Sequence, residues 1–281
     1  DGSSACFNVL LGSCAGKGIT SGAQNIFIGK YAGACGSVTG AGNIGIGEEA
    51  GRKSTSAEYN VHIGQKTGTE LTTAIKTVFI GNEAGEKRQT GHFNIAVGNN
   101  ALKGSGTAAD NTGAKNVAIG NFAGYKVEDG GENVFMGHYA GYAVTSADKN
   151  VLIGDSIACA LTTGGCNTIL GMKSGRRMTT GHTNVFLGYY AGEGASSSGG
   201  TGHNNIAIGN KALSEKWTSA TYNIALGVSA GLCISTGSGN VNLGYHAGCA
   251  NTDAVCNIAI GSAAGSMNGT GDHNISLGTD A

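Results

Sequence analysis

The feature that most constrains this chain is a nine-residue phrase that recurs from one end to the other. It reads NVLLGSCAG at residues 8–16, NIFIGKYAG at 25–33 and NIGIGEEAG at 43–51, and near-copies continue to NISLGTDA at 274–281. Aligned on their first residue, the sixteen copies are spaced mostly by 17 residues, with two spacings of 18 and one each of 21 and 22. A fixed period of this kind predicts a repeat architecture in which each copy is one structural unit.

Positions one to five of the repeat predict a short β-strand that ends at a corner. Position two is Val or Ile in every copy except Thr168, position four is always aliphatic or Met, and position five is always glycine. We expect the alternating residues at positions two and four to be buried on one face, with position three pointing outward. Glycine at position five suits unusual dihedral angles or close backbone contact. Position twelve is often apolar, which predicts a second, weaker inward-facing arm.

A single copy buries too few side chains to offset the entropy of ordering seventeen residues, at about 1–2 kcal/mol each, so the copies must stack. We therefore predict an all-β fold, a parallel β-solenoid (β-helix or β-roll) of about sixteen coils in one domain, residues 1–281. Insertions at about 103–115 and 193–203 are expected to be loops on one side. Position one is expected to form a structural amide ladder through Asn8, Asn25, Asn43, Asn60, Asn94, Asn116, Asn133, Asn150, Asn167, Asn184, Asn205, Asn223, Asn240, Asn257 and Asn274.

Charge and motif content argue against several functional classes. The chain has 17 Lys+Arg against 18 Asp+Glu, a net charge of −1, so no broad field should attract nucleic acid or an anionic membrane. No apolar run approaches the roughly 18–20 residues needed to span a bilayer. No carboxylate pair, metal-binding motif or phosphate loop recurs in register, so we expect no enzymatic activity, no cofactor and no metal. Histidines in TGH phrases, such as His182 and His203, are interpreted as solvent-facing turn residues that are not in consecutive coils.

The N-[IV]-x-[ILV]-G-x-x-A-G phrase resembles the repeats of phage tail-fibre shafts and of YadA-type trimeric adhesin heads, which are parallel β-rolls or β-helices. The resemblance covers essentially the whole chain. It implies an extracellular or virion-surface structural role, or attachment to a host surface, with a trimer as one form of assembly. The 17-residue period and the cysteines depart from those families.

Cysteine usage indicates an oxidising compartment, because the eight residues are even in number. Cys159 and Cys166 occupy positions ten and seventeen of one repeat, and Cys249 and Cys256 repeat that spacing. We predict a disulfide within each of these two coils, with unpaired buried thiols as the alternative. The pairing of the other four is left open: Cys6, Cys14, Cys35 and Cys233.

Position three, expected outside, carries four phenylalanines, and exposed aromatic residues in a line usually mark a covered surface. We predict that they form a lateral contact between parallel copies of the chain, although long loops of the same chain could also cover them. The four are Phe27, Phe79, Phe135 and Phe186. Asn268 opens an Asn-Gly-Thr triplet and is a candidate for N-glycosylation.

The chain begins and ends partway through the repeat, with half-coils at residues 1–7 and 274–281. We predict that the two half-coils meet between subunits, complete a shared coil and so produce a head-to-tail homopolymer outside the cell. Cys6, Cys14 and Ala281 would lie near that junction. The alternatives are a segment of a longer shaft, and a tail-fibre or adhesin shaft whose receptor is unknown.

Overall fold

The structure, a computed structural model, describes residues 5–194 and 199–281. Part of the predicted half-coil 1–7 and part of the predicted loop 193–203 therefore lie outside the described residues. The chain divides into two compact units, and each is described by itself; the prediction of a single domain stays a prediction. The units are Asp1–Tyr139 with Val144–Ser146, and Ala140–Ala143 with Ala147–Ala281.

Each unit is built from eight strands of three residues, one strand per repeat. The first unit contains β1 (Val9–Leu11), β2 (Ile26–Ile28), β3 (Ile44–Ile46), β4 (Val61–Ile63), β5 (Val78–Ile80), β6 (Ile95–Val97), β7 (Val117–Ile119) and β8 (Val134–Met136). The second contains β9 (Val151–Ile153), β10 (Thr168–Leu170), β11 (Val185–Leu187), β12 (Ile206–Ile208), β13 (Ile224–Leu226), β14 (Val241–Leu243), β15 (Ile258–Ile260) and β16 (Ile275–Leu277).

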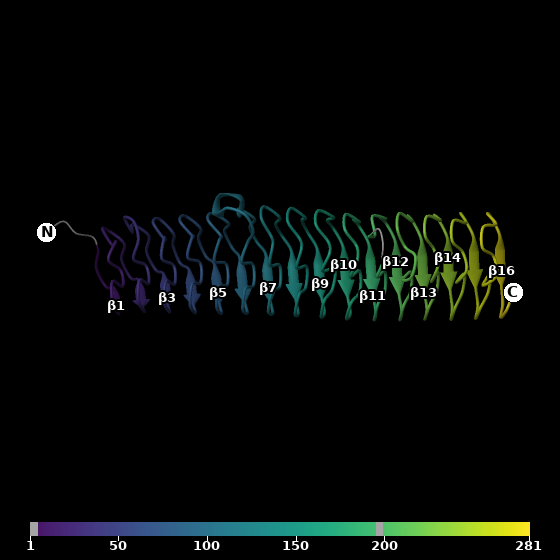
Figure 1. The fold of residues 1–281 in the computed structure, drawn as a ribbon, viewed down its shortest axis with the longest axis horizontal. Helices are drawn as coiled ribbons and strands as arrows, with labels where there is room; N and C mark the ends of the chain where they lie inside the picture. Colours follow the sequence, from purple (N-terminus) through teal and green to yellow (C-terminus); the bar gives the residue numbers. More distant parts are fainter. Residues whose placement is uncertain (1–4, 195–198) are drawn as a thin grey trace. The chain divides into compact units, whose positions relative to one another are not determined.

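Within each unit, every strand pairs in parallel with the strand of the next repeat (Figure 1). The pairing joins equivalent repeat positions, as in Ile46 opposite Ile63 and Leu226 opposite Leu243. The backbone amide of Val61, for example, donates to Thr77 O at 2.9 Å. Apart from the short 3-10 helix η1 (Ala108–Asp110), the described residues contain no helix. The predicted fold class, an all-β parallel solenoid with about one coil per 17 residues, is confirmed.

The corner after each strand explains the invariant glycine. At Gly64 the φ angle is +132°, and a Cβ atom there would lie 2.6 Å from Gly81 O of the next coil. The same close approach links successive position-five glycines, so a side chain would force neighbouring coils apart. Position nine is tight for another reason, because a Cβ on Gly124 would lie 2.7 Å from the ring of Phe135. The position-five glycines therefore follow from the close stacking of coils, and the position-nine glycines follow from the packing of buried side chains inside the coils.

The predicted direction of the strand side chains is wrong. Position three is buried, as in Leu152 and Ile169, whereas positions two and four lie outside, as in Ile95 and Ile63. The reason is the buried asparagine at position one: alternation along the strand places position three on its side and positions two and four on the other. The inward direction of position twelve is confirmed, for example by the fully buried Leu161.

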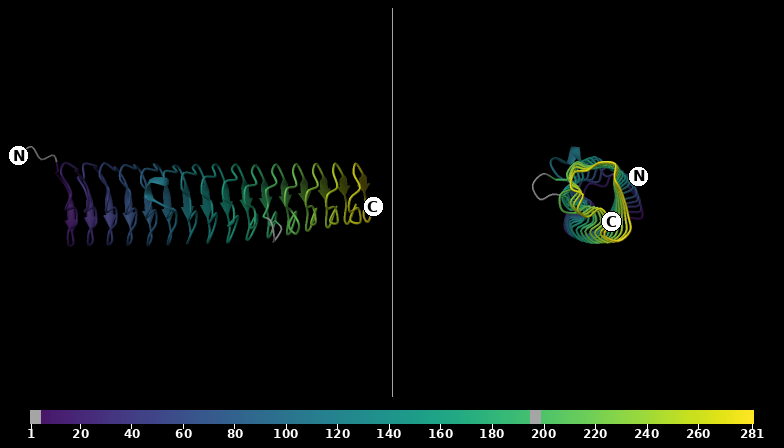
Figure 2. Two further views of the ribbon diagram at one scale, coloured as in Figure 1. Left: turned by 45° about the horizontal axis from the view of Figure 1, so that its top comes forward. Right: turned by 90° about the vertical axis from the view of Figure 1, so that its right-hand side faces the viewer.

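The backbone of each coil encloses a narrow interior (Figure 2). Side chains of unequal size fill this interior. In the first unit, Phe27 at position three lies against Gly45 at the same position of the next coil, where a Cβ would approach the ring to 2.9 Å. Alanine at position eight, such as Ala32 and Ala50, completes this packing. Large and small residues along one column thus fit one another, which gives the close packing typical of protein interiors.

The insertion at 103–115 lies outside the strand ladder of the first unit. β6 and β7 on either side of it pair in full register, Ile95 with Val117 and Val97 with Ile119. Asn111, which is buried, ties the loop together by donating to Ser105 O at 2.8 Å. The repeat therefore tolerates the extra residues because they leave the backbone pairing of the coils unchanged.

Candidate functional site: an exposed aliphatic face on each unit

The outward side chains of the strands form a continuous aliphatic surface on each unit. We define the aliphatic face as repeat positions two and four, the first and third residues of every strand. Because neighbouring strands pair in register, these side chains form two columns across the coils. The members remain partly exposed, with 37% for Ile63 and 39% for Ile119 in the first unit, and 39% for Ile208 and 40% for Ile260 in the second.

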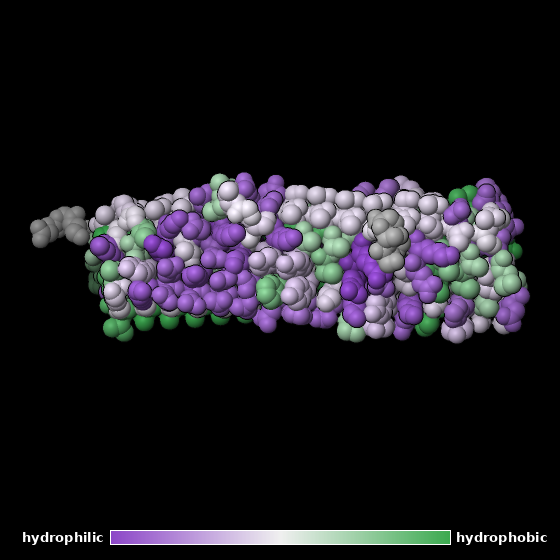
Figure 3. All heavy atoms as spheres, in the orientation of Figure 1, coloured by the Kyte–Doolittle hydropathy of each residue, from purple (hydrophilic) through white to green (hydrophobic). Residues whose placement is uncertain are grey.

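The aliphatic face has no charged residue in any of the sixteen strands, and Thr168 is its one polar member. The surface elsewhere differs. In Figure 3 the side of the first unit turned to the viewer is largely hydrophilic, and hydrophobic residues emerge along its lower rim. A contiguous apolar surface of this extent is unusual for a protein without partners and generally marks an interaction site.

The four phenylalanines predicted to make a lateral contact are not on this face. Each is at most 1% exposed and belongs to the interior of its coil. The correction follows from the reversed side-chain direction, since position three points inward. The residues are Phe27, Phe79, Phe135 and Phe186.

The position-one asparagines join successive coils through their side chains. The amide nitrogen of Asn60 donates both to Asn43 Oδ1 at 3.0 Å and to Ala74 O at 2.9 Å, while its backbone N–H donates to Asn43 Oδ1 at 3.1 Å. Where threonine replaces asparagine, Thr77 Oγ1 donates to Asn60 Oδ1 at 2.8 Å. The same pattern recurs in the second unit, as between Asn184 and Asn167. Where they are buried between coils, these side chains have a structural role, because hydrogen bonds occupy both ends of the amide. Asn274, in the last coil, is exposed and donates its backbone N–H to Asn257 Oδ1 at 2.7 Å.

All eight cysteines are free thiols, so the two predicted disulfides are not formed. Cys159 Sγ lies 3.5 Å from Arg176 O and Cys249 Sγ lies 3.8 Å from Ser266 O, both in the following coil. Their predicted partners, Cys166 and Cys256, are exposed at corners with φ near +58°. Positions ten and seventeen thus differ in environment, and burial raises the pKa of the Cys159 and Cys249 thiols.

Cys249 has another cysteine beside it on the preceding coil. The backbone N–H of Cys233 donates to Cys249 O at 3.1 Å. In a sequence alignment these two residues occupy positions eleven and ten, and only the pairing of coils brings them together. The backbone pairing of the coils therefore places Cys233, which is not the predicted partner, next to Cys249.

Three residues predicted near a junction between subunits, and the glycosylation candidate, have ordinary local contacts. Cys6 O accepts from Gln24 N at 3.0 Å, and Ala281 O accepts from Gly265 N at 2.8 Å. Cys14 is half-buried, with its Sγ 3.9 Å from Ser13 Oγ. The amide of Asn268 donates to Gly271 O at 3.2 Å. Junction formation and glycosylation both stay predictions.

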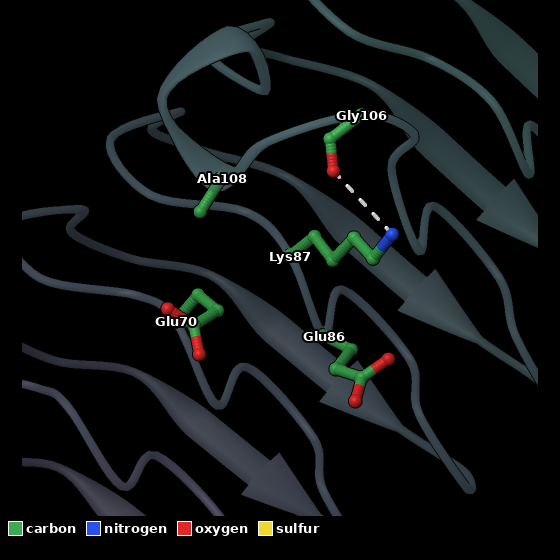
Figure 4. A pocket seen from close by; sticks show the side chains of 5 residues that line it. All are labelled: Glu70, Glu86, Lys87, Gly106 and Ala108. Carbon is green, nitrogen blue, oxygen red and sulfur yellow. Dashed lines mark hydrogen bonds between the residues drawn. The ribbon is translucent and has the colours of Figure 1, made fainter.

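A small cavity of about 210 Å³ lies beside the insertion in the first unit (Figure 4). Glu70, Glu86, Lys87, Gly106 and Ala108 line it, and Lys87 Nζ donates to Gly106 O at 3.5 Å.

Both carboxylates of this cavity already have cationic partners. Glu70 pairs with Lys53 at 2.6 Å, and Glu86 pairs with Lys103 at 3.1 Å. Over residues 5–194 and 199–281, no group of three His, Cys, Asp or Glu side chains is arranged to hold a metal ion. The cavity is therefore best described as a neutralised ion-pair network under a loop.

His62, in the interior of the first unit, was missed by sequence reasoning. It occupies position three, stacks on Phe79 with ring centroids 5.2 Å apart, and has Nε2 3.2 Å from Thr77 Oγ1. Burial lowers the pKa of His62 to about 4, so the ring is neutral at pH 7. The strand alternation that buries position three would have found it.

Arg88 is also fully buried, at position twelve. Its guanidinium donates to Gly113 O at 3.2 Å, Glu128 O at 3.1 Å and Val127 O at 3.3 Å. Burial lowers the pKa of Arg88 to about 10, so the group still carries its charge at neutral pH. Its place at an otherwise apolar repeat position was the available sequence signal.

The histidines in TGH phrases are closer together than predicted. His182 and His203 belong to consecutive coils of the second unit, and their rings stack with centroids 4.5 Å apart.

Within the described parts of the chain, no helix is long and apolar enough to cross a membrane. Comparisons of the chain with protein-family models, with curated proteins and with solved structures found no match.

Proposed function

We propose that this chain is a non-catalytic structural protein of an extracellular fibre, in which solenoids pack side by side through their aliphatic faces. The observation that carries the proposal is the uncharged, partly exposed double column of Ile, Val and Leu on each unit. Covering one side chain that is about one third exposed contributes on the order of 0.5 kcal/mol. Because every repeat adds two such residues, the total grows with the number of coils in contact.

A second copy of the chain is the partner that fits this face best. The columns have the spacing of parallel strands, about 4.8 Å, and another copy presents ridges with the same period. A globular partner would match that period over only a few strands. Because the face has no charged residue, it cannot form ion pairs with a charged partner. Shape and apolar area therefore favour self-association.

We also propose two specific forms of assembly for the chain. Three copies around a common axis would bury the same face and would agree with the resemblance to tail-fibre and adhesin shafts, whose role is attachment to a surface. End-to-end joining into a filament would use the backbone pairing that links successive coils, such as Gly85 N to Ala101 O at 2.9 Å. The extracellular location rests on the resemblance.

The test is the oligomeric state of the purified chain and of two charge variants, measured by light scattering after size exclusion. We expect the wild type to form dimers, trimers or larger species. Ile63→Lys combined with Ile119→Lys, and Ile208→Lys combined with Leu226→Lys, should shift it to monomer, because lysine is costly to bury in an apolar contact. The matched control is Val228→Lys, at position six, which is 46% exposed but outside the aliphatic face.

Two results would overturn the proposal. One is a wild type that stays monomeric at high micromolar concentration, and the other is a control variant that dissociates the assembly as fully as the face variants. Electron microscopy of the same samples separates the forms of assembly. Open filaments of variable length indicate end-to-end joining, whereas particles of one length indicate a closed dimer or trimer. Surface labelling of the cells or particles that produce the chain tests its location.

A further inference from the structure

A cleft on the second unit combines aromatic and basic side chains. Its volume is about 500 Å³, and it spans residues that follow three successive strands, β10, β11 and β12. The lining residues are Arg176, Arg177, Tyr189, Tyr190, Glu193 and Lys211. The whole cleft belongs to one unit, and none of its lining residues belongs to the aliphatic face.

The cleft is positively charged although the chain as a whole is not. Three cations and one carboxylate line it, a net charge of +2, whereas the chain carries −1. The two guanidiniums share that single carboxylate: Arg177 Nη1 lies 3.5 Å and Arg176 Nη1 lies 4.0 Å from Glu193 Oε1. Both arginine side chains remain about two fifths exposed, at 39% and 40%, so their remaining N–H groups can reach a bound anion.

Two adjacent tyrosines form the aromatic part of the cleft. The rings of Tyr189 and Tyr190 lie 4.3 Å apart at 75°, so one ring offers its face beside the edge of the other. Lys173 fixes the second ring, because its Nζ donates to the Tyr190 hydroxyl at 3.0 Å and lies 5.3 Å from the ring centroid. Tyr189 is 40% exposed and is free to contact a ligand with its ring.

We propose that this cleft binds an anionic saccharide, a sugar chain that bears sulfate or carboxylate groups. The guanidiniums and Lys211 match the anionic substituents, which arginine binds in a bidentate manner. Glu193 accepts hydrogen bonds from sugar hydroxyls, and the tyrosine rings cover the apolar C–H face of a sugar ring. A nucleic acid has few hydroxyl donors for Glu193 and favours a longer cationic track, so it fits this set of groups less well.

The proposal is independent of lateral assembly. Binding through the cleft uses residues outside the aliphatic face, so a monomeric face variant should bind the saccharide as well as the wild type does. Loss of one property with retention of the other therefore identifies which proposal has failed.

The chain supplies a matched control for charge. Arg52 and Lys53 stand at repeat positions ten and eleven, the positions of Arg176 and Arg177, but Gln65 follows at position six of the next coil, where the cleft has Tyr189. Arg52 pairs with Glu49 at 3.3 Å, so this region also contains a carboxylate. It therefore presents two cations at the same repeat positions without the tyrosine pair, and its Lys53 is paired with Glu70 at 2.6 Å.

The experiment measures binding by titration calorimetry to four probes: a dextran sulfate oligosaccharide, uncharged dextran of the same length, inorganic sulfate and oligo-dT of the same charge. We expect the sulfated saccharide to bind at least about tenfold more tightly than each of the other three. Arg176→Gln with Arg177→Gln, and separately Tyr189→Ala, should each weaken that binding by about tenfold or more. Arg52→Gln with Lys53→Gln should change it by less than about twofold.

Several outcomes would overturn the proposal. Equal weakening by the Arg52 and Lys53 control would indicate diffuse attraction, tight binding of inorganic sulfate would indicate a simple anion site, and tighter binding of oligo-dT would indicate a nucleic-acid site. Unchanged binding in Tyr189→Ala would remove the role of the ring. Thermal melts of each variant establish that it is folded, and Tyr189→Phe, which keeps the ring, should retain binding and so separates stacking from misfolding.

Discussion

Each unit contains an insertion, and the interior beside it is filled by a charged side chain in the first unit and by an aromatic side chain in the second. In the first unit the insertion at 103–115 is accompanied by Arg88, whose guanidinium donates to three backbone carbonyls, one of them Gly113 O within the insertion. In the second unit the insertion at 193–203 is accompanied by Trp217, which is fully buried. The ring of Trp217 meets Phe186 edge-on, with centroids 5.4 Å apart, and lies directly against Gly200.

The difference shows what an insertion demands of a solenoid. In the first unit Ser105 stands at repeat position twelve of the coil that carries the insertion and is only half-buried, so Arg88 of the preceding coil fills the interior there. The wall facing Arg88 is made of carbonyl groups, so a donor fits there. The wall facing Trp217 includes Gly200 and Gly202, so a large flat ring fits there. The residue that fills the interior beside each insertion, Arg88 or Trp217, therefore matches the chemistry of the groups around it.

The two units also differ in their buried ionisable groups. Among the described residues, the buried ionisable side chains are His62 and Arg88, and both belong to the first unit. The second unit instead buries the neutral polar side chain of Asn242 at position three. The two units should therefore respond differently to pH and to the removal of their fillers.

The largest effect is expected from Trp217→Ala. Removing the ring leaves a cavity against Gly200 and Phe186, and substitutions of this kind cost about 3–5 kcal/mol. Chemical denaturation followed by circular dichroism measures the change in the free energy of unfolding. Hydrogen exchange assigns it, because the loss of protection should be concentrated in the second unit.

The matched control for this prediction is Trp217→Phe. It keeps an aromatic ring at the site and should cost clearly less than Trp217→Ala. Equal destabilisation by the two variants, or loss of protection in the first unit instead of the second, would mean that the ring does not act as a local filler.

How far the sequence predicts this molecule depends on the kind of information in the repeat. Stacking, the strand positions and the corner glycines follow from a period that every copy obeys, and no tertiary detail is needed to find them. The burial of positions two and four was predicted wrongly because β-branched residues in two columns suit a buried sheet face and an apolar exposed face equally well. The sizes at position three contained the answer, since Phe27 beside Gly45 makes sense only in a confined interior.

Contacts between coils were harder to predict than contacts within them. The pairing of Cys249 with Cys256 rested on spacing along one coil, yet its backbone neighbour is Cys233 on the coil before. The cleft around Tyr189 and Arg177 likewise joins side chains from separate coils, and their pattern does not recur in other repeats. Periodicity predicts what all copies share, whereas candidate binding sites arise where single copies depart from it.

The second largest effect is a loss of stability of the first unit in mild acid. His62 has a pKa of about 4 in the folded state against 6.5 as the ordinary value, so between these pH values the unfolded chain binds a proton that the folded chain does not. Stability is therefore complete above about pH 6.5 and falls as the pH is lowered toward 4, by a total on the order of 3 kcal/mol.

Measurements of unfolding free energy at pH 7.5 and pH 4.5 test this, with His62→Phe as the control. Phenylalanine occurs at the same repeat position in Phe27 and Phe135, so it should fit, and it cannot titrate. The variant should lose most of the pH dependence between these values. If the stability of the variant falls as steeply as that of the wild type, carboxylates elsewhere cause the effect. His62 would then not make the first unit more sensitive to acid than the second.

A smaller effect is expected from Arg88→Met, which preserves length and removes the buried charge. Two of the three carbonyls retain a donor, since Asn94 Nδ2 still reaches Gly113 O at 2.9 Å and Gly113 N still reaches Glu128 O at 2.9 Å. Burying an apolar chain in place of a guanidinium without a carboxylate partner also relieves a desolvation cost. We expect a net loss of about 1–2 kcal/mol in unfolding free energy, from the carbonyl of Val127.

Arg88→Ala separates the two contributions, because it removes the apolar stem as well. It should be worse than Arg88→Met, by the additional cavity. A Met variant that is as unstable as the Ala variant would show that the hydrogen bonds of Arg88, and not its volume, stabilise the first unit. Arg88 would then differ from Trp217, which acts through its volume.

The smallest effect, and the one opposite in sign, is expected from Asn242→Ala in the second unit. The side-chain amide of Asn242 is buried, and neither its oxygen nor its nitrogen has a hydrogen-bond partner among the described residues. Alanine occupies the same position in both neighbouring coils, at Ala225 and Ala259, so the interior there already accommodates a methyl group. Removing an unsatisfied amide outweighs the small cavity that alanine leaves, and we expect stabilisation of up to about 1 kcal/mol in denaturant unfolding. Asn240→Ala, which removes a hydrogen-bonded amide of the ladder two residues away, should instead destabilise the unit. Destabilisation by both variants would show that the amide of Asn242 is hydrogen-bonded in solution. The second unit would then accommodate a buried neutral polar side chain as well as the first unit accommodates Arg88.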